Sequence, residues 1–254
     1  MANKEDTADL PETYKMDNKR RGNVLIFNQE NFHNLSRRFG TATDKTNLTA
    51  SFEALGFEVT CYDDSDKKTM KSNLEKASKE NYSDADCIVC IFLSHGEEGH
   101  IFAKDNKISI KEIIDFFRGN NCRSLVGKPK IFIFQACRGD IGEDAVTPMV
   151  GDDDMAAEVM EDAAVVFTLP AGADFLMCYC ASEGFTAFRH IEEGTYYIQE
   201  LCKVLQKQGS TLEFTELLTL VNLKVSRHSL GNKKQMPCFS STLTKKLYFR
   251  PKEQ

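Results

Sequence analysis

Cys137 and His95 are the two residues of this sequence whose types and positions could form a catalytic pair. A free thiol has a pKa of about 8.5, so near neutral pH it needs a base or a cation to become the nucleophilic thiolate. A histidine can take the proton and later return it to a leaving group. The chemistry open to such a pair is attack on a carbonyl through a covalent intermediate, as in cysteine hydrolases.

Two apolar runs of strand length precede these residues and would position them. Residues 131–134 alternate Ile and Phe behind Pro129 and Lys130, and they lead into the polar turn that carries Cys137. Residues 86–94 end at His95. Apolar side chains at helical spacing in residues 108–117 supply the crossover that parallel strands require. Open α/β sheets place their ligands at the carboxyl ends of parallel strands. We therefore expect Cys137 and His95 to meet at one edge of a parallel sheet.

The rest of the chain alternates strand and helix patterns, which predicts an α/β fold with a parallel sheet covered on both faces. Asp44 is a plausible N-cap for the first helix, and Gly56 would end it. Residues 139–169 lack a clean period, and a loop of this length is usually functional or disordered. Further strands are expected at residues 22–27, 57–62, 173–182, 237–243 and 246–249, and further helices at 45–55, 67–79, 194–208 and 212–225.

Composition excludes several classes of protein. A chain of 254 residues can form one large domain with a substantial core. Its net charge is −6, and no lysine or arginine occurs between Arg138 and Arg189, so we expect no nucleic-acid partner. No apolar run approaches a membrane span and the N-terminus is polar, so we expect no membrane association and a cytoplasmic location.

The nine cysteines show no disulfide framework. Cys87 and Cys90 form a CxxC pattern, which could indicate redox chemistry or zinc, but residues three apart on a strand point to opposite faces. We favour core positions for both and expect neither a metal nor a cofactor. Cys178 and Cys180 share a strand face but are poorly spaced for a disulfide. The remaining histidines, expected as surface loop residues without a paired partner, are His33, His100 and His228.

Two motifs resemble the caspases. Gln135-Ala-Cys-Arg-Gly139 matches the caspase nucleophile signature, and Leu93-Ser-His-Gly-Glu-Glu-Gly99 resembles the caspase histidine loop. The resemblance runs nearly end to end and looks most like the executioner (effector) members. It implies a caspase-like three-layer sandwich, with a mostly parallel six-stranded sheet and helices on both faces. It also implies an Asp-specific cysteine endopeptidase that acts in apoptosis.

The resemblance assigns roles to individual residues. Cys137 would be the nucleophile and His95 the base, which a backbone carbonyl at Ser36 would orient in place of a third side chain. Backbone N–H groups of Gly96 and Cys137 would hold the oxyanion. The pocket for the Asp at P1 would be formed by Arg38, Gln135 and Arg189, since guanidinium groups match a carboxylate in bidentate geometry. The neighbouring subsites, where the sequence has no tryptophan and the P4 preference stays open, would use Phe188, His190 and Tyr196.

The resemblance also implies a zymogen. Residues 1–13 would be a short prodomain and 14–254 the catalytic domain, divided into a large subunit (14–144), an acidic linker (145–169) and a small subunit (170–254). Asp144 and Asp162 each precede an alanine and are candidate cut sites. The alternative is a solvated linker with no processing role. Asp9 is a further candidate, and the alternative there is a merely solvated acidic tail.

The expected partners are protein substrates with Asp at P1, a second copy that pairs at the strand from residue 237, initiator caspases and inhibitor-of-apoptosis proteins. Two other functions remain open. A caspase-like enzyme that cleaves after Lys or Arg is disfavoured because Arg38 and Arg189 would repel a basic residue. A catalytically silent homologue that acts by binding is disfavoured because Cys137 and His95 are intact.

Overall fold

The computed structural model describes residues 12–138, 171–183, 193–229 and 231–252, together with the backbone of 143–144 and 189–190. At its centre is a six-stranded sheet with the order β13-β9-β7-β3-β1-β2. Five strands run parallel, and β13 runs antiparallel to β9. The expected mostly parallel sheet is therefore confirmed, with one antiparallel edge. Its strands are β1 (Arg20–Asn28), β2 (Glu58–Asp63), β3 (Ala85–Leu93), β7 (Lys130–Gln135), β9 (Phe175–Tyr179) and β13 (Cys238–Ser241).

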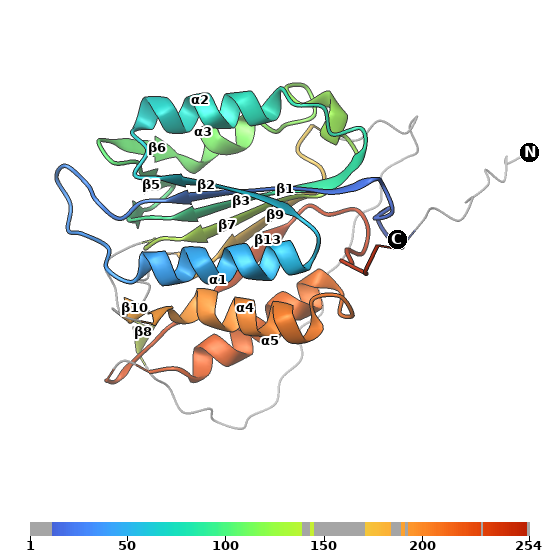
Figure 1. Cartoon of the computed structure of the whole chain (residues 1–254). Helices are drawn as coiled ribbons and strands as arrows, with labels where there is room; N and C mark the ends of the chain where they lie inside the picture. Colours follow the sequence, from blue (N-terminus) through green and yellow to red (C-terminus); the bar gives the residue numbers. More distant parts are fainter. Residues whose placement is uncertain are drawn as a thin grey trace, which may run out of the picture.

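Helices cover both faces of this sheet (Figure 1). One face packs against α1 (Thr41–Ala54), α4 (Tyr196–Gln208) and α5 (Phe214–Arg227). The other packs against α2 (Lys67–Ser78) and α3 (Ile110–Asp115). Every residue of β3 and β7 is buried, which is why residues 87–93 and 131–134 are continuous apolar runs rather than alternating ones. The three-layer arrangement is the one expected from the sequence.

A row of stacked aromatic rings crosses the sheet near the carboxyl ends of its central strands. Phe27 stacks on Phe92 with ring centroids 5.0 Å apart, Phe92 on Phe134 at 5.2 Å, and Phe134 on Tyr179 at 5.4 Å. A shift of one residue would move each ring to the opposite face, so these contacts specify the register of β1, β3, β7 and β9. That register determines which residues meet at the carboxyl edge.

Short strands that the sequence did not predict lie at this edge. β4 (Gly96–Glu97), β5 (His100–Phe102) and β6 (Lys107–Ser109) form an antiparallel sheet directly after β3. Ser109 then caps α3 by accepting a hydrogen bond from the Glu112 N–H at 3.1 Å. The remaining short elements are β8 (Glu143–Asp144), which pairs with β12 (Lys233–Lys234), β10 (Arg189–His190), which pairs with β11 (Gly194–Thr195), and the 3₁₀ helix η1 (Arg123–Leu125).

Two local predictions were wrong. Helix α1 begins at Thr41 after Gly40, so Asp44 is not its N-cap but a buried residue that accepts the Thr195 N–H at 2.9 Å. Residues 246–249 form no strand, only an isolated bridge between Lys246 and Thr13. Their apolar side chains pack into the core instead, where the Phe249 ring contacts those of Phe57 and Phe214.

The histidine prediction was partly wrong as well. His228 stacks on Tyr196 with ring centroids 4.5 Å apart, and its Nε2 lies 3.2 Å from Glu200 Oε1. His100 Nδ1 lies 3.0 Å from the Glu98 carbonyl oxygen. His33 is exposed, as expected.

The cysteine predictions were confirmed. Cys87 lies in the core beneath α1, α4 and α5, and Cys90 lies in the core beneath α2 and α3. The CxxC residues therefore face opposite sides of β3. All nine cysteines are free, including Cys178 and Cys180.

Candidate active site

The histidine loop and the cysteine turn meet at the carboxyl edge of the sheet. Leu93 of β3 pairs with Gln135 of β7, so His95 and Cys137 each lie two residues beyond the same row. The backbones approach so closely that a Cβ added to Gly96 would lie 2.6 Å from the Cys137 carbonyl oxygen and 2.8 Å from the Ala136 Cβ. Only glycine permits such an approach without displacement. The predicted juxtaposition of the two loops is confirmed.

The imidazole of His95 is oriented by the loop that follows β1. Its Nε2 lies 2.8 Å from the Ser36 carbonyl oxygen, and its ring centroid is 4.8 Å from that of Phe32. A carbonyl oxygen only accepts hydrogen bonds, so in the neutral ring Nε2 carries the proton and Nδ1 is the basic nitrogen. The contact with the Ser36 carbonyl is the one that the resemblance predicted.

Cys137 differs from most of the other thiols in its exposure. It is partly exposed at the end of the turn, whereas its neighbour Cys180 is buried and donates to the Ala136 carbonyl oxygen at 3.3 Å. Burial raises the pKa of Cys180 well above its ordinary value, so that thiol stays protonated at neutral pH. The same is true of Cys87, Cys90 and Cys178. Cys137 is the thiol that the histidine loop lies against.

Arg38 and Gln135 are both buried at this edge, each with an exposed fraction of 2%. Arg38 Nη1 donates to the Gln29 carbonyl oxygen at 2.9 Å and to Thr41 Oγ1 at 3.0 Å. Gln135 Oε1 has no hydrogen-bond partner among the described residues. Burial is the largest influence on the pKa of Cys180, which Cys137 raises further and Arg38 lowers. Cys137 and Arg38 are thus both close enough to Cys180 to influence its charge state.

Arg189 belongs to a segment that α1 holds in place. Its backbone pairs with Thr195, and His190 pairs with Gly194, in the β10–β11 ladder. Asp44 accepts the Thr195 N–H, so the first turn of α1 is tied to the strand beside Arg189. This contact was not predicted from the sequence, because an Asp near a helix start is usually a cap.

The other predicted site residues lie partly or wholly outside the part of the chain that the structure describes. Phe188, Asp9 and Asp162 fall outside it. Of Arg189, His190 and Asp144, the backbone alone is described, and Asp144 pairs with Lys233 in the β8–β12 ladder. Tyr196 is described, in the first turn of α4 and stacked on His228.

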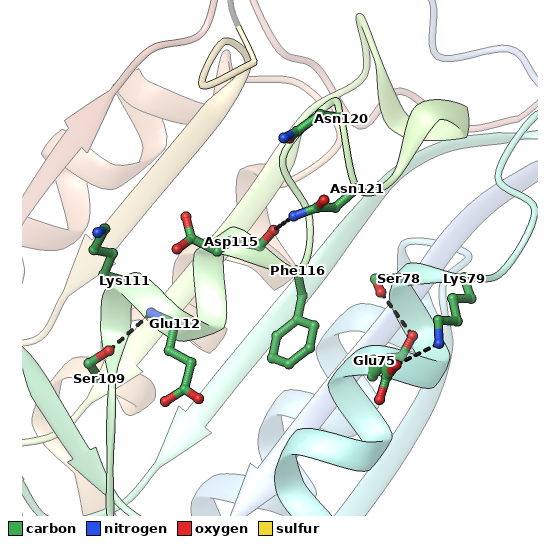
Figure 2. A pocket seen from close by; sticks show the side chains of 10 residues that line it. All are labelled: Glu75, Ser78, Lys79, Ser109, Lys111, Glu112, Asp115, Phe116, Asn120 and Asn121. Carbon is green, nitrogen blue, oxygen red and sulfur yellow. Dashed lines mark hydrogen bonds and ion pairs between the residues drawn. The ribbon is translucent and has the colours of Figure 1, made fainter.

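A separate cleft of about 710 Å³ lies between α2 and the segment that contains α3 (Figure 2). Its lining contains no thiol and no histidine, and its charged groups include the Glu75–Lys79 pair at 2.5 Å. It has no nucleophile paired with a base, so it offers no alternative to the carboxyl edge. Among the described residues there is also no group of three metal-ligating side chains. In the same part of the chain, no helix is long and apolar enough to cross a membrane.

Comparisons with known proteins agree with this geometry. The family model described as the caspase domain matches residues 21–248. The chain is 49% identical to caspase-6 of Gallus gallus over 99% of this chain and 88% of that protein. It is 50% identical to caspase-6 of Bos taurus over 97% of this chain and 89% of that protein. With caspase-3 of Bos taurus the identity is 40%, over 94% and 88% of the two chains.

Proposed function

The chain belongs to the caspase family, and we propose that Cys137 and His95 carry out its reaction as nucleophile and general base. The protein is an executioner-like, Asp-specific cysteine endopeptidase that acts in apoptosis. The observation that carries the residue assignment is the packing of Gly96 against the Cys137 turn, next to a histidine oriented by the Ser36 carbonyl.

The mechanism follows from the tautomer of His95. With Nε2 bound to Ser36, Nδ1 accepts the proton of the Cys137 thiol, and the thiolate attacks the carbonyl carbon of the scissile bond. The N–H groups of Gly96 and Cys137 stabilise the resulting oxyanion. His95 then donates its proton to the leaving amine, which breaks the C–N bond and leaves a thioester. Water hydrolyses the thioester and restores the thiol.

The carboxylate of the P1 Asp would be bound by Arg38, Gln135 and Arg189. Arg38 contacts Gln29, which follows β1, and Gln135 ends β7 two residues before Cys137, so both lie at the carboxyl edge of the sheet. A buried carboxylate needs such paired donors. Phe188, His190 and Tyr196 would line the subsites for the residues before Asp. The stacking of Tyr196 on His228 supports a fixed position for that ring.

Replacing Cys137 by Ser and His95 by Ala tests the catalytic assignment. Each variant should lose nearly all cleavage of an Asp-containing peptide while keeping the thermal midpoint of the wild type. Cys61→Ser is the matched control, since Cys61 is an exposed thiol on β2. An irreversible Asp-based inhibitor should label wild type and Cys61→Ser stoichiometrically and Cys137→Ser not at all. Normal turnover by Cys137→Ser would refute the assignment, and a wild type that binds no inhibitor would indicate a silent homologue.

The zymogen organisation is part of the proposal. Cleavage after Asp144 or Asp162 would separate a large subunit (14–144) from a small subunit (170–254) across the linker 145–169, and cleavage after Asp9 would remove most of the prodomain 1–13. The β8–β12 ladder ties residues 143–144, at the end of the proposed large subunit, to residues 233–234 of the proposed small subunit. A cut after Asp144 would require this ladder to open.

The remaining partners and the location also belong to the proposal. β13 is an edge strand, and its outer N–H and C=O groups could pair with those of a second copy to form a homodimer. Initiator caspases would cut the linker, and inhibitor-of-apoptosis proteins would be further partners. A cytoplasmic location is supported by the nine free cysteines, since disulfides are rare in that compartment.

A further inference from the structure

Arg38 lies on a loop where neither helix nor strand fixes its position. The loop between β1 and α1 is closed by the Arg38 N–H, which donates to the Glu30 carbonyl oxygen at 2.9 Å. The guanidinium itself is held through Nη1, which donates to the Gln29 carbonyl oxygen and to Thr41 Oγ1. These two bonds use both N–H groups of Nη1. The orientation of the guanidinium therefore depends on the position of Thr41.

The acceptor Thr41 is itself oriented by a further hydrogen bond. Its hydroxyl donates to Asn28 Oδ1 at 2.6 Å, and Thr41 and Asn28 have exposed fractions of 0% and 3%. A hydroxyl has one proton, so when that proton goes to Asn28 a lone pair of Oγ1 is directed at Arg38. The direction of the Arg38 contact is thus set by Asn28.

The amide of Asn28 is anchored in turn at the protein surface. Asn28 Nδ2 donates to Asp63 Oδ1 at 2.8 Å, and Lys45 Nζ donates to the same carboxylate at 2.8 and 2.9 Å. The bond between Asn28 and Asp63 fixes the rotation of the amide group, so that Oδ1 is presented to Thr41. A continuous chain of hydrogen bonds therefore runs from a surface ion pair to the guanidinium.

We propose that Thr41 and Asn28 are positioning residues that set the orientation of Arg38 toward the P1 carboxylate and so sharpen the preference for Asp over Glu. The inference rests on the proposed placement of Arg38 in the P1 pocket. A guanidinium fixed in one orientation would meet the P1 carboxylate at one depth. The longer Glu side chain then cannot reach the bidentate geometry that Asp reaches. Without the hydrogen bonds of Thr41 and Asn28, the guanidinium can tilt and bind the carboxylate of either Asp or Glu.

Thr41→Val tests this, because valine keeps the shape of threonine and removes the hydroxyl. We expect kcat/KM on an Asp peptide to fall about 10- to 100-fold, mainly through KM, and the ratio of Asp to Glu cleavage to fall with it. Thr41→Ser restores the hydroxyl and should remain within about threefold of the wild type. Asn28→Ala should act in the same direction as Thr41→Val. The matched control is Thr46→Val, the same change on an exposed residue of α1 whose hydroxyl donates to the Ala42 carbonyl oxygen.

A readout that avoids the P1 pocket separates positioning from general damage. Alkylation of Cys137 by iodoacetamide needs no carboxylate pocket, so its rate in Thr41→Val should match the wild type. If Thr41→Val lost alkylation and cleavage equally, or if the Asp-to-Glu ratio stayed constant in both Thr41→Val and Asn28→Ala, the positioning role would be refuted. Arg38→Ala distinguishes the assignment of Arg38 to the P1 pocket from the positioning role of Thr41 and Asn28. Normal cleavage of the Asp peptide by Arg38→Ala would refute the pocket assignment. Loss of cleavage in Arg38→Ala together with normal cleavage by Thr41→Val would refute only the positioning role.

Discussion

Replacing Gly96 by Ala should separate catalysis from folding in this protein. The new Cβ would lie 2.6 Å from the Cys137 carbonyl oxygen, about 0.8 Å inside the 3.4 Å at which ordinary contact begins. It would also lie 2.8 Å from the Ala136 Cβ. Neither the carbonyl oxygen nor this Cβ can move away by a side-chain rotation. The histidine loop and the cysteine turn must therefore move apart.

The expected magnitude follows from that displacement. A misplacement near 1 Å costs on the order of 100-fold in rate, which corresponds to about 2.7 kcal/mol of activation free energy. Overpacking of this kind also lowers the free energy of unfolding by about 1–3 kcal/mol. The measurement is kcat/KM on an Asp peptide, together with a urea unfolding curve on the same preparation.

Gly99→Ala supplies the matched control. Gly99 lies in the same loop with a φ of +69°, and a Cβ there would meet no atom within 4 Å. The left-handed backbone alone should cost about 1–2 kcal/mol of stability, comparable to the loss in Gly96→Ala, with activity within a few-fold of the wild type. A folded Gly96→Ala variant with wild-type kcat/KM would show that the contact between the loops does not position the site.

Three further outcomes are expected. Arg189→Lys keeps the charge but loses the bidentate fork, so kcat/KM on Asp peptides should fall steeply, and cleavage after Lys would contradict the pocket. Asp144→Ala combined with Asp162→Ala should leave a chain that runs uncut on a denaturing gel and cleaves an Asp peptide weakly. A double variant that is fully active and still found in two pieces would contradict these cut sites. Folding stability should fall as the pH rises above about 8.5, since unfolded thiols ionise there while folded ones with raised pKa values do not. At pH 9.5 the loss is about 1.4 kcal/mol per thiol, measurable by urea unfolding at pH 7.5 and 9.5, and a flat profile would contradict burial of Cys87, Cys90, Cys178 and Cys180.

The sequence was informative where one physical constraint dominated a long segment. β3 and β7 are buried on both faces, so their apolar runs could only be central strands. Helices α4 and α5 bury one side against the sheet and show the helical period that was read from the sequence. The placement of His95 and Cys137 then followed from the parallel direction of their strands.

The predictions failed where contacts distant in sequence decided the structure. β4, β5 and β6 have two or three residues each, too few for an alternating pattern to be recognised. His228 has its acidic partner 28 residues away on α4, and no local pattern marks that pair. Residues 246–249 alternate like a strand because Leu247 and Phe249 are both core residues, although no ladder forms there.

The first turn of α1 contains two buried polar residues that contact the segments carrying Arg38 and Arg189. Thr41 and Asp44 both have exposed fractions of 0%, and buried polar groups are costly unless they are hydrogen-bonded. Thr41 accepts from Arg38, and Asp44 accepts from Thr195, whose strand pairs with Arg189. One helical turn therefore holds the two segments that carry the arginines. Gly194 makes this possible, since a Cβ there would lie 2.2 Å from Asp44 Oδ1. The backbone spacing of these two segments is thus set by the fold.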